Sequence, residues 1–172
     1  MPNYTPILLT LSATIAYAAL PGTTICHYQS LDHLDATGLV TMDHCHVHGL
    51  VRIQGSLQAK DSQITHLQLN GQSVLTNVTI DQANLTGSLQ AQSSRFNDIH
   101  LISQHASFTQ CHLNNLAISH SQPALVILKN AQIAGTLKFT QYPGQVLADN
   151  SQINQLINGQ FIQNKESTCT TA

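Results

Sequence analysis

Apolar and small side chains recur along this chain at intervals of two, three, two, three and two residues. The pattern is clearest between residues 57 and 69, where these positions are Leu57, Ala59, Ser62, Ile64, Leu67 and Leu69. Every residue between them is polar. A spacing of two puts alternate side chains on one face of a strand, and the step to three marks a corner. The block therefore predicts three short strands joined by corners.

The block repeats along the chain at a step of sixteen or seventeen residues, and later of twenty. The pentapeptide GSLQA begins at Gly55 and again at Gly87, and the related GTLKF begins at Gly135. An amphipathic helix needs apolar residues at i, i+3, i+4 and i+7, which these blocks lack. We therefore predict an all-β fold, a three-sided parallel β-helix with about 16–20 residues per coil. Parallel crossovers are right-handed in nearly all proteins, so we expect that hand here.

Alignment of the blocks also predicts the corners. Polar residues that favour turns fall into one column and should form a hydrogen-bonded stack: Asp61, Asn77, Ser93, Gln110, Asn130 and Asn150.

The same alignment places Leu50 in an inward column. Arg52 and Lys138 stand where the pattern requires an apolar residue, so we expect a one-residue bulge at each, which would turn Ile53 and Phe139 inward.

The five-residue register of the coils resembles two known families. Residues 83–87 (ANLTG) and 111–115 (CHLNN) resemble the unit of pentapeptide-repeat proteins, whose β-helix has four sides. A step of 16 or 17 leaves room for only three sides and, with Gly55, Gly71 and Gly87, resembles the bactofilin-type polymer-forming β-helices. This resemblance covers residues 39–160 and implies a cytoplasmic scaffold that polymerises end to end, a role from which a cleaved export signal would depart.

The N-terminal region predicts export. An apolar run from Ile7 to Leu20 contains Ala16-Tyr17-Ala18, which fits the rule for signal cleavage, although no Lys or Arg precedes the run. We predict a signal peptide at 1–18, a β-helix domain at 19–162 and a flexible polar tail at 163–172. The mature chain would be periplasmic or extracellular, with no integral membrane span. The alternative is a buried helix that covers one end of a cytoplasmic protein.

Charge and motifs argue against several functions. Only 8% of the residues are charged and the formal net charge is −2, so nucleic acid is not an expected partner. Asp61, Asp81 and Asp98 fall in different columns, away from Arg52 and Arg95, and do not form the carboxylate pair of a glycosidase. The chain contains no G-x-S-x-G, glycine-rich phosphate loop or HExxH. We predict a non-enzymatic protein without cofactors.

Four cysteines permit two disulfides in an exported protein. Cys26 and Cys45 are nineteen residues apart, about one coil, and are the disulfide candidates if their inward side chains stack. Free core thiols are the alternative. Cys111 lies some four coils from Cys45 and should not pair with it, and Cys169 falls in the polar tail.

The stretch TMDHCHVHGL, residues 41–50, places His44, His46 and His48 at alternate, outward positions. Adjacent histidines in a strand lie about 6.6 Å apart at Cα and can share a metal ion, whereas His44 and His48 are about 13 Å apart. A neighbouring coil can add His27 or His33. We favour ordinary outward polar residues, with a metal site at these histidines as the alternative.

These observations together predict an exported β-solenoid scaffold or adaptor, which engages a protein partner or itself through its faces or ends. One alternative is a cytoplasmic, bactofilin-like scaffold that polymerises. The others are a metal-binding module at His44, His46 and His48, and a carbohydrate-binding or carbohydrate-cleaving β-helix. The carbohydrate alternative needs exposed aromatic residues or carboxylates along one face, and the four tyrosines of the chain do not align in that way.

Overall fold

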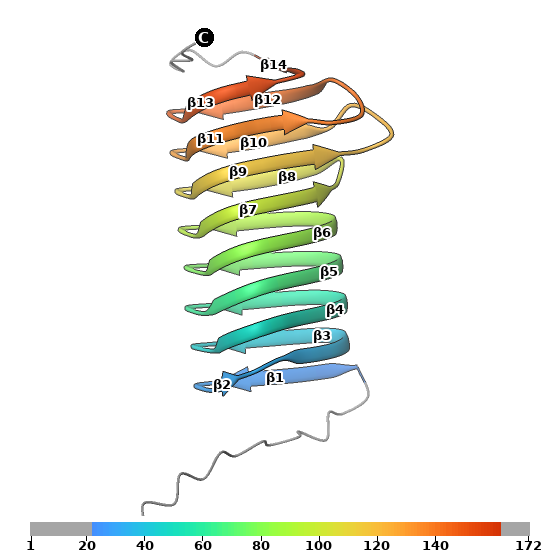
Figure 1. Ribbon diagram of the computed structural model, residues 1–172, viewed down its shortest axis with the longest axis vertical. Coiled ribbons are helices and arrows are strands. Elements are labelled where there is room, and N and C mark those ends of the chain that lie inside the picture. Colours follow the sequence, from blue (N-terminus) through green and yellow to red (C-terminus); the bar gives the residue numbers. More distant parts are fainter. Residues whose placement is uncertain (1–21, 163–172) are drawn as a thin grey trace, which may run out of the picture.

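The computed structural model describes residues 22–162, which form a parallel β-solenoid of about eight turns (Figure 1). Among these residues there is no helix of the length and apolar character that a membrane span requires. The strands are β1 (Thr23–His27), β2 (Ser30–Leu31), β3 (Leu34–Asp43), β4 (His46–Lys60), β5 (Gln63–Thr76), β6 (Thr79–Gln92), β7 (Arg95–Ile102), β8 (His105–Thr109), β9 (His112–Ser119), β10 (Leu125–Lys129), β11 (Gln132–Phe139), β12 (Gly144–Asp149), β13 (Gln152–Ile157) and β14 (Gly159–Phe161).

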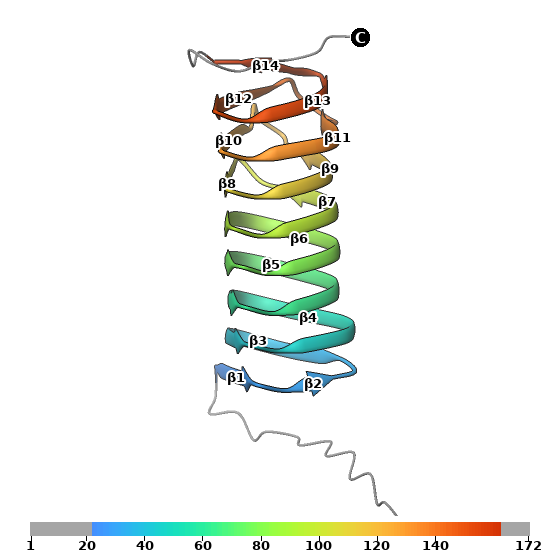
Figure 2. The ribbon, with the colours of Figure 1, turned by 90° about the vertical axis from the view of Figure 1, so that its left-hand side faces the viewer.

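Each strand pairs in parallel with a strand one coil away, and the strands between the first and last coils do so on both sides. Leu69 in β5 lies opposite Leu85 in β6, a step of sixteen residues. Ala106 in β8 lies opposite Val126 in β10, a step of twenty. The predicted all-β parallel helix, with coils of about 16–20 residues, is confirmed, and paired residues stand 15 to 21 positions apart. The stack is regular from β3 to β7, and the later coils carry the longer connections (Figure 2).

The predicted inward columns form one continuous apolar core, mostly aliphatic, with Phe96, Phe108 and Phe139 among its members. Leu57, Ile64 and Leu67 are almost fully buried, as are their counterparts in the coils between the first and the last. Burial of each such side chain contributes about 1.5–3 kcal/mol. The intervening residues are exposed Gln, Asn, Thr and His, so the alternation in the sequence becomes an apolar inside and a polar, nearly uncharged outside.

One corner of every coil is made by a residue with positive φ. These residues form a single column: Tyr28, His44, Asp61, Asn77, Ser93, Gln110, Asn130 and Asn150. Asn77 Nδ2 donates a hydrogen bond of 2.6 Å to Asp61 Oδ1, and Asn150 Nδ2 donates one of 2.7 Å to Asn130 Oδ1. Ser93 Oγ donates to Gln110 Oε1 at 3.3 Å. The predicted hydrogen-bonded stack is present at these three steps.

A second corner is made by stacked glycines at 38, 55, 71 and 87. At Gly71 the backbone has a φ of 146°, and an added Cβ would collide with the carbonyl oxygen of Gly55. Only glycine allows the coils to approach so closely at this corner. The later coils have no such glycine, and their chain bulges outward in the connections at 120–124 and 140–143 (Figure 1).

The bulges predicted at Arg52 and Lys138 are present, but each lies in the corner that precedes the residue, and not at the residue itself. The register shifts by one residue between Val47 and Leu50, and again between Ile133 and Leu137. Val51 is therefore buried, and the prediction that Leu50 points inward is wrong. A corner residue has no alternation to maintain, so an extra residue is accommodated there more easily than within a strand.

The similarity between GTLKF and GSLQA is a coincidence of sequence. Leu57 of GSLQA pairs with Ser73, whereas Leu137 of GTLKF pairs with Leu116 on a different side of the coil. Gly135 occupies the bulged corner instead of the glycine column. A Cβ there would press against the Asn114 carbonyl oxygen, so its close backbone contact resembles that of Gly55 although its place in the coil differs.

Candidate functional site

The densest group of titratable side chains lies at the positive-φ corner of the first three coils. His44 has a φ of 54° and Asp61 a φ of 49°. Because both are corner residues of successive coils, the two residues stack one above the other. Asp43 lies between two histidines, with Oδ2 3.0 Å from His27 Nδ1 and Oδ1 2.8 Å from His44 Nδ1. His44 Nε2 lies 3.8 Å from Asp61 Oδ2. We call His27, Asp43, His44 and Asp61 the corner cluster.

Two further residues border the corner cluster. The Tyr28 ring stacks on the His44 ring, with their centroids 4.6 Å apart and their planes 21° apart. Lys60 Nζ lies 3.6 Å from Asp61 Oδ2. The hydrogen bond from Asn77 is the main reason that the pKa of Asp61 lies below its ordinary value; the charges of Lys60 and His44 add to this, and desolvation opposes it. The Asp61 carboxylate therefore persists to lower pH than that of an isolated aspartate.

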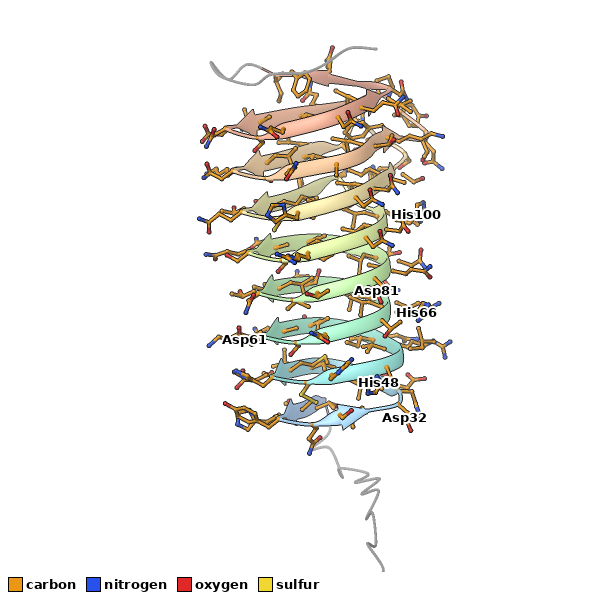
Figure 3. The ribbon with its side chains drawn as sticks, turned by 60° about the vertical axis from the view of Figure 1, so that its left-hand side comes forward. Asp32, His48, Asp61, His66, Asp81 and His100 are labelled. Atoms are coloured by element: carbon orange, nitrogen blue, oxygen red, sulfur yellow. A yellow bond between two sulfur atoms is a disulfide. The ribbon has the colours of Figure 1, made fainter. Side chains whose placement is uncertain are left out.

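The structure divides the three histidines predicted as a group. His44 belongs to the corner cluster because its positive φ makes it a corner residue. His46 and His48 lie together on the next side of the coil, with ring centroids 4.0 Å apart. Ser30 Oγ lies 3.0 Å from His48 Nε2. Figure 3 shows Asp61, which marks the corner column, on the opposite edge of the solenoid from His48.

Cys26 and Cys45 form a disulfide, with an S–S distance of 2.12 Å and a Cα–Cα distance of 6.3 Å. Their side chains both point inward but occupy neighbouring columns, since Cys26 pairs with Met42 and Cys45 follows the corner. The two candidate cysteines are therefore joined without sharing one column, and the bond crosses the corner diagonally. His27 follows Cys26 directly and His44 precedes Cys45, so each bonded cysteine directly adjoins a residue of the corner cluster in the sequence.

Cys111 is fully buried and is the one free cysteine among residues 22–162. Burial raises the pKa of its thiol, although hydrogen bonds with the backbone of Ser94 and Thr109 oppose this. Such a thiol serves as a small apolar core residue. Cys169 lies outside the described residues, as do the predicted signal peptide and polar tail.

A shallow groove runs along the short side of the central coils. Its lining comes mainly from three successive coils, which contribute the backbone at Ile80, Phe96 and Leu113, whose side chains are buried, and the flanking polar residues Thr79, Arg95, His112, Asp81, Asn97 and Asn114. No ion pair within the described residues involves Arg95 or Asp81. The groove thus presents amides, a hydroxyl and isolated charges, without the paired carboxylates that glycoside hydrolysis requires.

The last coil ends in an apolar strand edge. β13 pairs only with β11, and β14 only with β12, so their other edges face away from all described strands. Ile157, Phe161 and Ile162 are exposed there, and Leu156 is half-buried. Residues 150–162 contain no charged side chain. We call this surface the C-terminal edge (Figure 1, β13 and β14).

The first coil forms the opposite end of the solenoid. Among the described strands, β1 pairs only with β3, and β2 only with β4. Ile25 is 60% exposed, and Leu31 and Leu34 are only partly buried. We call this surface the N-terminal edge. Both edges therefore combine unpaired parallel strands with apolar side chains.

No protein-family model, curated protein or solved structure matches this chain.

The sequence contained a signal for the corner cluster. Asp61 stands seventeen residues after His44, one coil step, so the predicted corner column already extends to His44. The proximity of Asp43 to His27 depends on the register of the first coil, because Asp43 pairs directly with His27.

Proposed function

We propose that this protein is a non-enzymatic scaffold whose copies associate end to end, the C-terminal edge of one copy docking on the N-terminal edge of the next. The observation that carries the proposal is the C-terminal edge itself. It combines unpaired strand backbone, exposed Ile157, Phe161 and Ile162, and no charge over residues 150–162. Natural edge strands are usually protected by charges, prolines or a covering element, and this one has neither charge nor proline.

The two edges are compatible partners. All coils run in the same direction, so β1 and β2 of a second copy would continue the parallel ladder beyond β13 and β14. Exposed Ile25 and the half-buried Leu31 and Leu34 offer apolar surface to the C-terminal edge. Such a contact joins two different surfaces and does not close on itself, so its product is an open filament.

Export is the second part of the proposal. Structural disulfides persist in oxidising compartments, and the Cys26–Cys45 bond is consistent with the periplasm or the cell exterior. The alternative is a cytoplasmic polymer of the bactofilin kind, with Met1 retained. Intact mass of protein from a cell fraction separates these outcomes. A chain starting at Ala19 and two mass units below its reduced mass supports export, and a reduced chain starting at Met1 supports the alternative.

End-to-end association is tested by light scattering after size-exclusion chromatography of the full chain. We expect the average mass to rise with protein concentration. The double variant Ile157→Glu/Phe161→Glu should elute as a single copy. Ile102→Glu is the matched control, because Ile102 is 42% exposed but lies on the side of a central coil.

A mixing experiment tests the direction of assembly. The double variant retains its N-terminal edge, so it should add to a growing end and stop it. A substoichiometric amount should therefore shorten wild-type assemblies. Wild-type protein that stays a single copy at all concentrations would overturn the proposal, as would equal dissociation by the Ile102→Glu control.

A further inference from the structure

We infer that the corner cluster is a binding site for one divalent transition-metal ion, with Zn²⁺ the best match. The inference is independent of the proposed end-to-end association. It begins with the donor atoms: one oxygen each of Asp43 and Asp61 and one ring nitrogen of His44 all lie within 4.8 Å of one another. His27 Nδ1 lies 3.0 Å from Asp43 Oδ2, outside this group of three, and rotation of its exposed side chain can bring it in as a fourth donor.

The donor set selects the class of ion. Two imidazoles and two carboxylates suit Zn²⁺, which takes four N, O or S ligands at about 2.0–2.2 Å in tetrahedral geometry. Ca²⁺ takes six to eight oxygen ligands, and Mg²⁺ requires an octahedral site with mainly oxygen ligands. Small adjustments of these exposed side chains convert the observed donor separations into a shared coordination sphere.

The fold holds the donors in place before any ion arrives. His44 and Asp61 are aligned by the positive-φ backbone at successive corners. Asn77 holds Asp61 Oδ1, which leaves Oδ2 directed toward His44. The stacked Tyr28 ring restricts rotation of the His44 ring. Partners of this kind orient metal ligands, and their loss typically weakens binding by a factor of about 10–100.

The disulfide adds a second constraint. Cys26 and Cys45 directly adjoin His27 and His44, so the bond joins the end of β1, which carries His27, to the corner that carries His44. Without it, β1 is held to the solenoid by β3 alone among the described strands. The site is thus complete only when the first coil is fixed, and a bound ion would in turn stabilise that coil.

Lys60 is the natural competitor for the ion. Its ammonium group lies 3.6 Å from Asp61 Oδ2, the oxygen assigned to the metal. A bound cation and this ammonium repel each other, so Lys60 has to swing into solvent, which its exposure permits. Removal of the charge by Lys60→Gln should therefore strengthen binding severalfold.

The experiment is isothermal titration of Zn²⁺ into untagged, oxidised full chain carrying Cys169→Ser, which removes a thiol outside the described residues. We expect one ion per chain. His44→Ala and Asp43→Asn should each weaken binding at least tenfold, while His46→Ala and His66→Ala should not change it. Circular dichroism checks that every variant keeps its fold.

A variant without the disulfide tests whether the ion binds at the corner cluster and not elsewhere on the chain. Cys26→Ser/Cys45→Ser removes the bond without leaving thiols that bind zinc, and it should weaken binding at least tenfold. Absence of binding to the oxidised chain would overturn the inference, as would loss of binding in His46→Ala with retention in His44→Ala. The zinc titration is repeated with the Ile157→Glu/Phe161→Glu variant, which should not associate. One ion should still bind per chain, which shows that metal binding does not depend on end-to-end association.

Discussion

Asn77 Nδ2 lies 2.6 Å from Oδ1 of Asp61, one coil earlier, and donates the shortest of the hydrogen bonds that connect the corner column. The contact ties a corner residue of one coil to the corner residue of the next. It also keeps the Asp61 carboxylate at a fixed position beside His44. The corner column is therefore both a structural connection between coils and the support of the corner cluster.

The first prediction concerns the pH dependence of this contact. The folded-state pKa of Asp61 lies below its ordinary value, mainly because of Asn77. The carboxylate therefore stabilises the fold above the unfolded-state pKa, about 3.9, and loses this contribution as the pH falls through the folded-state pKa. In Asn77→Ala the pKa of Asp61 should rise, as measured by carboxyl NMR titration. Asn84→Ala, on a side of the same solenoid, should leave it unchanged, and an equal rise there would contradict the assignment.

The second prediction concerns a repeated buried serine. Ser94 Oγ accepts a hydrogen bond from the Val78 amide at 3.1 Å and donates one to the Gln92 carbonyl at 2.8 Å. Ser62 and Ser151 bridge coils in the same way. Because Ser94→Ala leaves a buried amide without a partner, it should lower the free energy of unfolding by about 1–3 kcal/mol.

Urea unfolding followed by circular dichroism measures the effect of Ser94→Ala. The control is Ser88→Ala, an exposed position, which should change the free energy of unfolding by less than about 0.5 kcal/mol. If both variants lose the same stability, the hydroxyl bridge contributes nothing specific.

The third prediction concerns the glycine column. Gly71→Ala places a Cβ at a positive φ and against the Gly55 carbonyl oxygen. The conformational strain alone costs about 1–3 kcal/mol, and the collision adds to it. Gly22→Ala shares the positive φ, at 95°, but its Cβ meets nothing within 4 Å. Thermal unfolding should therefore show a clearly larger loss for Gly71→Ala, and similar losses would mean that the coils separate at this corner without difficulty.

The fourth prediction concerns the first coil. The Cys26–Cys45 bond closes a loop with a sequence separation of 19, for which loop-closure entropy predicts a stabilisation of about 3 kcal/mol. In a solenoid each coil contacts only its neighbours, so the loss should be local. Amide hydrogen exchange of Cys26→Ser/Cys45→Ser should speed up in β1 and the start of β3, while β6 and β9 keep their protection. Uniform acceleration throughout the chain would show that the coils unfold as one cooperative unit.

The inward columns could be predicted from sequence because alternation is a local property. Val47 and Ile64 had to share a column once the coil length was known, and both are buried. The same reasoning located the corner column from Asp61 onward. The same reasoning failed at Leu50 and at Gly135, because each lies in a corner that holds one extra residue. The strand after such a corner still alternates, but each of its residues is displaced by one position relative to the columns of the neighbouring coil.

The candidate site depended on such details. Sequence spacing grouped His44 with His46 and His48, because the three alternate along the chain. The backbone turns at His44, so its neighbours are instead Asp43 and Asp61. The positive φ of His44 thus separates this histidine from His46 and His48 and places it beside the carboxylates of Asp43 and Asp61.

The sequence by itself determined the class of fold, the length of the coils and the division of residues between core and surface, since each follows from the spacing of apolar side chains over a few residues. Only the tertiary structure decided where the extra residues are placed, which columns the disulfide joins and which side chains meet at the corners. These features depend on the register between coils. That register is set by backbone conformation at the corners, where side-chain hydrophobicity provides no periodic signal.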